Sequence, residues 1–119
     1  MTRGNYQLIL YLPKATALQV GRRGTFLFPA GRYVYTGSAL NGVERRLARH
    51  QRQNKRLHWH IDYFLRYARI TSIRIFPTPR NVECALNRKV LRRPEAQVIA
   101  KGFGSSDCRC VSHLVFLRQ

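Results

Sequence analysis

The sequence predicts an α+β fold, in which a small sheet is covered by about three helices within a single domain, residues 1–119. Two observations lead to this prediction. Residues 6–12 and 70–76 alternate as strands do, whereas residues 43–53 and 59–68 carry apolar side chains at helical spacing. A chain of 119 residues is large enough for one modest hydrophobic core.

The first half of the chain contributes strands. Residues 6–12 place a tyrosine and three leucines on one face, which predicts a largely buried strand. Residues 20–26 predict the turn of an extra hairpin, because two glycines bracket a pair of arginines between short strands. Residues 32–36 are rich in tyrosine and valine, which favours a second long strand.

Helices dominate the middle of the chain. Residues 43–53 predict a helix with a narrow apolar stripe and arginines elsewhere, and residues 59–68 predict a second helix. A third helix is expected over residues 81–92, with Val82, Leu86 and Val90 inward.

The remaining elements are one strand at residues 70–76, a loop at 101–106 and a last strand at 113–117. Pro77 and Pro79 end the first of these strands. Together the elements predict a mixed or antiparallel sheet flanked by helices.

The charge balance points to a polyanionic partner. Lys and Arg number 22 against five acidic residues, which gives a net charge of +17. Nucleic acid is the natural partner, because each neutralised phosphate releases counterions. No apolar run is long enough to span a bilayer and no signal peptide is recognisable, so we expect a cytoplasmic protein that binds DNA and no membrane. RNA stays open, because charge does not distinguish the two polymers.

The cysteines suit a reducing compartment better than a disulfide framework, because their number is odd. Cys108 and Cys110, with His113 and the distant Cys84, also suggest a zinc site. The paired knuckles of a strong zinc signature are missing, however, so the sequence favours buried thiols over structural zinc.

Acidic residues limit the metal chemistry. No two of the five form an adjacent pair, so a two-metal nuclease site is hard to build. One Mg²⁺ or Mn²⁺ ion, held by one carboxylate, waters and a substrate phosphate, is a better match. Glu83 is the best ligand, since it stands near the start of a helix and off its apolar stripe. The alternative is that Glu83 only complements the helix dipole.

Tyrosines and arginines provide the other candidates for catalysis. Neighbouring cations favour an ionised phenol, so Tyr6 or Tyr35 could act as a base or orient water. Structural roles are the alternative, because tyrosine suits a strand. Arg46 and His50 share a helix face, from which an arginine can stabilise a phosphate and a histidine can assist proton transfer.

Other residues are candidates for contacts with the nucleic-acid backbone. They are Arg45 and Arg49 on the neighbouring ridge of the helix, His58 and His60, and Lys101 and Ser105 in the glycine-rich loop. His58 could also pair with Asp62 across one helical turn.

Taken together, these segments resemble the GIY-YIG endonuclease superfamily, and more closely its Uri-type branch. Gly4-Asn5-Tyr6 and Tyr35-Thr36-Gly37 stand at the two superfamily motifs, although Asn5 replaces an apolar residue. With the motifs similar to the branch, the resemblance covers nearly the whole chain in order: Tyr33 to Ala39, Arg49-His50, His58 to Tyr63, Glu83-Cys84, Gly102 to Cys110, and Ser112-His113-Leu114.

The resemblance implies a three-stranded antiparallel core sheet flanked by helices, and hydrolysis of DNA with one metal ion. It assigns Tyr6 and Tyr35 to the two motifs, an arginine to the first helix and the metal-binding acid to Glu83. Arg46 fits the arginine best, and Arg45 remains an alternative. The hypothesis is therefore a DNA endonuclease of repair or processing. The competing hypotheses are a non-catalytic nucleic-acid-binding module and a zinc-stabilised interaction domain.

Overall fold

A computed structural model describes residues 2–53, 55–105 and 109–118. Its centre is an antiparallel five-stranded sheet in the order β5-β1-β4-β7-β6. The strands are β1 (Gly4–Leu12), β4 (Gly31–Ala39), β5 (Arg69–Pro77), β6 (Ala96–Gln97) and β7 (Leu114–Leu117). The predicted α+β class is confirmed, but β7 and β6 extend the sheet from three strands to five.

The predicted hairpin is a separate two-stranded sheet. It pairs β2 (Thr16–Gln19) with β3 (Thr25–Phe28), and a short 3-10 turn (Gly21–Arg23) joins the strands. Both arginines of that turn, Arg22 and Arg23, are exposed.

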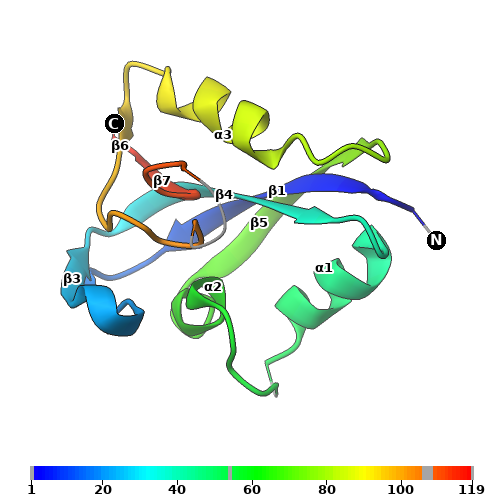
Figure 1. The fold of residues 1–119 in the computed structure, drawn as a ribbon. Helices are drawn as coiled ribbons and strands as arrows, with labels where there is room; N and C mark the ends of the chain where they lie inside the picture. The colour runs from blue at the N-terminus through cyan, green and yellow to red at the C-terminus, as the bar shows by residue number, and fades with distance from the viewer. Residues whose placement is uncertain (1, 54, 106–108, 119) are drawn as a thin grey trace.

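Helices cover both faces of the main sheet (Figure 1). They are α1 (Val43–Gln51), α2 (His60–Phe64) and α3 (Glu83–Leu91). In Figure 1, α3 lies above the sheet, and α1 and α2 lie below it. Within the described residues, no helix has the length and apolar character needed to cross a membrane.

The alternation of β1 and β4 divides the core in two. Tyr6, Leu8 and Tyr35 face α1 and α2, where they pack with residues such as Val43 and Phe64. On the other face a smaller cluster packs beneath α3, formed by Val34, Val90, Val115 and Leu117. Side chains one position apart on β1 therefore reach opposite layers of the fold.

Two helices differ in detail from the prediction. Helix α2 ends at Phe64. Beyond it, backbone amides bond to the carbonyl three residues earlier instead of four, as where Tyr67 N donates to Phe64 O at 3.1 Å. The expected inward residues of that segment are nevertheless buried. In α3, Asn87 is fully buried and Leu86 only half-buried, so the inward face is rotated from the one predicted.

Strand β4 runs past its neighbour at one end. Strand β7 pairs with it only from Arg32 to Tyr35, whereas β4 continues to Ala39. Gly37 and Ser38 therefore lie on a stretch of β4 that β7 does not cover, close to where α3 begins.

Candidate active site

A cleft of about 540 Å³ opens beside the uncovered end of β4. It is lined by Tyr6, Tyr35, Gly37, Ser38, Arg46, His58, Trp59, His60, Glu83 and Gly104. The two motif tyrosines, the helix arginine and the candidate metal ligand thus come from four different elements to one cavity. Glu83 is the only carboxylate among these lining residues.

Gly37 allows Tyr6 to lie across β4. The two residues are directly paired in the β1–β4 register. A Cβ atom on Gly37 would lie 2.6 Å from Tyr6 Oη and 2.7 Å from its Cζ, well inside van der Waals contact. The glycine of the Tyr35-Thr36-Gly37 motif is therefore required by the position of the Tyr6 ring.

We expect Gly37→Ala to lower the free energy of unfolding by about 1–3 kcal/mol, because the added methyl group overpacks a buried site. Tyr6 is only 1% exposed and cannot simply swing aside. Denaturant unfolding of the variant measures the effect. Unchanged stability would show that the Tyr6 ring does not depend on this contact.

Burial keeps both tyrosines protonated. Desolvation raises the pKa of Tyr6 to about 12, although Arg46 beside it lowers the pKa. Desolvation also raises the pKa of Tyr35 well above its usual range. Arg46 does favour the ionised phenols, as expected, but desolvation outweighs it, so the expected net lowering of the two pKa values is wrong and both side chains offer O–H donors at neutral pH.

His50 supports Tyr6 from the core. Its Nε2 atom lies 2.7 Å from Tyr6 Oη, and the residue is 3% exposed. Burial, followed by the charge of Lys55, lowers the pKa of His50 to about 4. A neutral imidazole in this position suits the orientation of Tyr6 better than the binding of a phosphate as a cation.

The protonation of His50 predicts acid sensitivity. In the unfolded chain a histidine titrates near 6.5, whereas the pKa of folded His50 is about 4. Its contribution to stability is complete above about pH 6.5 and is lost as the pH falls toward 4, with a maximum of about 3 kcal/mol. Between these pH values the stability of His50→Gln should fall less steeply than that of the unmodified protein. His58→Gln, a change at an exposed histidine, serves as the control, and parallel curves for all three proteins would contradict the assignment.

Glu83 differs from the other described carboxylates. Glu44 accepts two hydrogen bonds from Thr2, and Asp62 and Glu95 form ion pairs with Arg49 and Arg93. Glu83 contacts Ser38 Oγ at 3.5 Å and His113 Nδ1 at 3.4 Å. No arginine or lysine of the described residues forms an ion pair with it, so its charge faces the cleft and can bind a cation.

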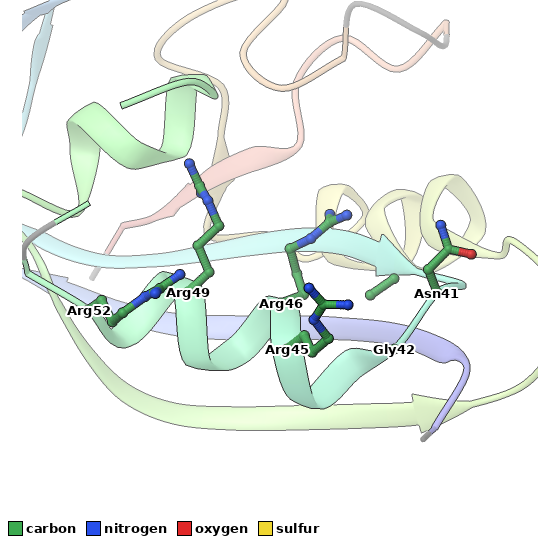
Figure 2. A pocket seen from close by; sticks show the side chains of 7 residues that line it. Asn41, Gly42, Arg45, Arg46, Arg49 and Arg52 are labelled. Carbon is green, nitrogen blue, oxygen red and sulfur yellow. The ribbon is translucent and has the colours of Figure 1, made fainter. Parts of the chain in front are cut away.

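The structure separates the two candidate arginines of α1. Arg46 lines the cleft, donates from Nη1 to Ser38 O at 3.1 Å and lies 4.4 Å from the centroid of the Trp59 ring. Arg45 lines the adjoining groove of about 250 Å³, which Arg46 also borders, and is not among the residues that line the cleft. Figure 2 shows that groove, with Arg45, Arg46 and Arg49 on α1, Asn41 and Gly42 before the helix, and Arg52 just after it. The geometry thus favours Arg46 as the arginine of the cleft.

Arg49 and Asp62 form a structural pair. Both guanidinium Nη atoms bind the Asp62 carboxylate, at 2.7 and 2.8 Å. Burial raises the pKa of Asp62, but hydrogen bonds from Arg49 and from the His58 and Trp59 amides outweigh burial and lower it. Asp62 thus accepts a hydrogen bond from the backbone amide of His58, whereas the sequence predicted a pairing with its side chain. Arg49 borders the groove with most of its charge already compensated.

The other candidates for phosphate contacts occupy different environments. His58 is exposed at the mouth of the cleft, and His60 Nδ1 accepts a hydrogen bond from Gly104 N at 3.0 Å. Lys101 lines a second groove beside Arg22 and Arg23, two residues that the sequence analysis did not select. The pair of arginines between glycines was the signal that could have identified them. Ser105 is only 5% exposed, so its side chain is not placed for the expected contact with a nucleic-acid backbone.

A second group of potential metal ligands lies next to the cleft. One ligand atom each from Cys84, Cys110 and His113 lie within 4.8 Å of one another. Cys108, the further zinc ligand suggested by the sequence, and Asp107, one of the five acidic residues, fall outside the described residues.

Comparison with known proteins gives the family of the chain. A family model described as "Domain of unknown function DUF123" matches residues 5–119. No curated protein and no solved structure shows significant similarity to the chain. The match covers nearly all of the sequence, including every residue that lines the cleft, and the protein therefore belongs to the DUF123 family.

Proposed function

We propose that this protein is a metal-dependent endonuclease that hydrolyses phosphodiester bonds in DNA, as its resemblance to the Uri-type branch of the GIY-YIG superfamily implies. The observation that carries the proposal is the meeting of Tyr6, Tyr35, Arg46 and Glu83 in one cleft. These residues are separated along the chain and come from β1, β4, α1 and α3. A structure-directed role in DNA repair or processing follows from the same resemblance.

Glu83 suits a hard divalent cation such as Mg²⁺ or Mn²⁺. Its carboxylate has no arginine or lysine partner among the described residues, and Mg²⁺ commonly uses one carboxylate together with waters and substrate phosphate. When bound, such an ion polarises a phosphoryl oxygen and lowers the pKa of water.

The side chains of the cleft then have distinct roles. Tyr6 and Tyr35 are neutral phenols that can donate hydrogen bonds to the attacking water or to a phosphate oxygen. Arg46 is held by Ser38 and Trp59, and its guanidinium stabilises the charge that develops on the phosphate. His50 is a positioning residue, because it acts through Tyr6.

DNA reaches this cleft across surfaces that carry the excess positive charge. The groove with Arg45 and Arg52 shares Arg46 with the cleft, and the groove with Arg22, Arg23 and Lys101 shares His60 with it. His58 also lines the cleft. Two cationic surfaces that adjoin the cleft suit a strand that passes over it.

The experiment is incubation of the purified protein with nicked, branched and single-stranded DNA in the presence of Mg²⁺ or Mn²⁺. We expect cleavage of at least one of these substrates that depends on the metal ion and is abolished by chelation. Absence of cleavage in every combination would overturn the proposal.

A non-catalytic nucleic-acid-binding module is the second candidate. The arginine groove beside the cleft favours it, because binding there requires neither Glu83 nor a metal ion. It predicts salt-sensitive binding that is indifferent to chelation. Parallel binding assays with DNA and RNA of the same sequence would identify the preferred polymer.

A further inference from the structure

A compact group of thiol and imidazole side chains adjoins the cleft. Cys84 is the second residue of α3, whereas Cys110 and His113 precede β7. One ligand atom from each lies within 4.8 Å of the other two. We propose that Cys84, Cys110 and His113 bind one Zn²⁺ ion, at a site separate from the carboxylate of Glu83.

The distances match the size of a zinc ion. With Zn–S near 2.3 Å and Zn–N near 2.0–2.1 Å, tetrahedral geometry places sulfur and nitrogen ligands about 3.6 Å apart. Cys84 Sγ and His113 Nε2 are 3.8 Å apart. Small side-chain adjustments are therefore enough to bring all three atoms to bonding distance.

The surroundings of His113 leave its Nε2 atom, and not Nδ1, facing Cys84. Its Nδ1 atom lies 3.1 Å from Thr36 O and 3.4 Å from Glu83 Oε2, and both of these atoms are acceptors. In the neutral imidazole that a metal ion requires, the proton therefore belongs on Nδ1, which leaves the lone pair of Nε2 directed toward Cys84. Acceptors of this kind behind a histidine are typical of metal sites.

Hydrogen bonds outside the cluster hold its backbone in place. Asn87 Nδ2 donates to Ser112 O at 2.6 Å, and His113 N donates to Phe103 O at 2.8 Å. His113 is 1% exposed, whereas both sulfur-bearing residues are half-buried. The ligands are thus preorganised and still accessible to an ion.

Thiolate and imidazole ligands select a different metal from the one proposed for the cleft. Soft thiolates favour zinc, whereas a lone carboxylate with waters favours magnesium. A zinc ion would link the start of α3 to the start of β7. Because Glu83 directly precedes Cys84, this link would also hold its carboxylate toward the cleft. The sequence favoured plain thiols, because Cys-x-Cys spacing does not show that α3 brings Cys84 to the same point.

Elemental analysis of the full chain, purified under reducing conditions without chelators, tests the proposal. We expect about one zinc ion per chain, with a solvent ligand completing the four that zinc prefers. Cys84→Ser and Cys110→Ser should each weaken zinc binding by more than about 100-fold, since loss of an outer partner alone costs 10–100-fold. His58→Gln removes an exposed imidazole outside the cluster and should keep the full zinc content.

Cobalt substitution provides a readout that does not depend on the stability of the variants. Co²⁺ added to the metal-free, unmodified protein should produce an intense thiolate-to-metal absorption band, which zinc then displaces. Absence of both zinc and this band, a disulfide between Cys84 and Cys110 in the reduced preparation, or a zinc affinity of Cys84→Ser equal to that of the unmodified protein in competition with a chelator would each overturn the proposal. None of these measurements involves DNA, so their outcome is independent of the proposed endonuclease activity.

Discussion

Glu83→Gln is expected to lower metal-dependent DNA cleavage by at least about 10³-fold, equivalent to about 4 kcal/mol of transition-state stabilisation. The substitution removes the charge of the only carboxylate among the residues that line the cleft. It keeps the size of the side chain and an acceptor for Ser38 and His113. DNA affinity without metal should be unchanged or improved, because one negative charge is lost from a surface that binds a polyanion. Single-turnover cleavage and equilibrium binding measure the two effects separately.

Glu95→Gln is the matched control. Glu95 is also a carboxylate, but it pairs with Arg93 and does not line the cleft. The control should cleave DNA at the rate of the unmodified protein. Cleavage that survives Glu83→Gln, or that is lost equally in the control, would show that Glu83 does not hold the catalytic metal ion.

Local patterns predicted most elements of the fold, because each pattern reflects burial of one face. The alternation at residues 6–12 corresponds to β1, and the helical spacing from Val43 corresponds to α1. Strand β6 has only two residues, which is too short for any periodic signal. The extension of the sheet from three strands to five depends on long-range pairing of β7 with β4, which no local pattern encodes.

Asn5 illustrates how a departure from a motif acquires a physical reason. It replaces the apolar residue expected between Gly4 and Tyr6, and it is completely buried. Its side chain donates to Arg80 O at 3.0 Å and accepts from Val82 N at 3.2 Å. These bonds fix the chain just before Glu83, so Asn5 helps to position the start of α3. Only the folded chain, in which the segment just before α3 meets Asn5 of β1, reveals this role.

The pKa values of the two cleft tyrosines depend mainly on burial, which cannot be determined from the sequence. An arginine-rich neighbourhood predicted lowered pKa values for Tyr6 and Tyr35, whereas desolvation raises both. The same reason explains Ser105, which a glycine-rich loop placed on the surface but which the structure buries. Charges can be counted along a chain, whereas the dielectric environment of each group appears only after folding.

Arg46→Ala is expected to lower the cleavage rate constant kcat by about 10²–10³-fold while changing KM little, because its guanidinium acts on charge that develops in the transition state. The hydrogen bond to Ser38 O and the contact with Trp59 hold this group at the cleft. Arg46→Lys should restore only part of the rate, since an ammonium group lacks the planar fork that binds two phosphate oxygens and stacks on an indole.

Arg45→Ala is the comparison that separates catalysis from binding, because it removes the same charge from a residue that lines the arginine groove but not the cleft. It should leave kcat unchanged, weaken DNA binding similarly for every sequence, and reduce the salt dependence of binding by about one phosphate contact. If Arg45→Ala lowered kcat and Arg46→Ala affected only affinity, the roles of the two arginines would be reversed, and a transition-state role for Arg46 would be excluded.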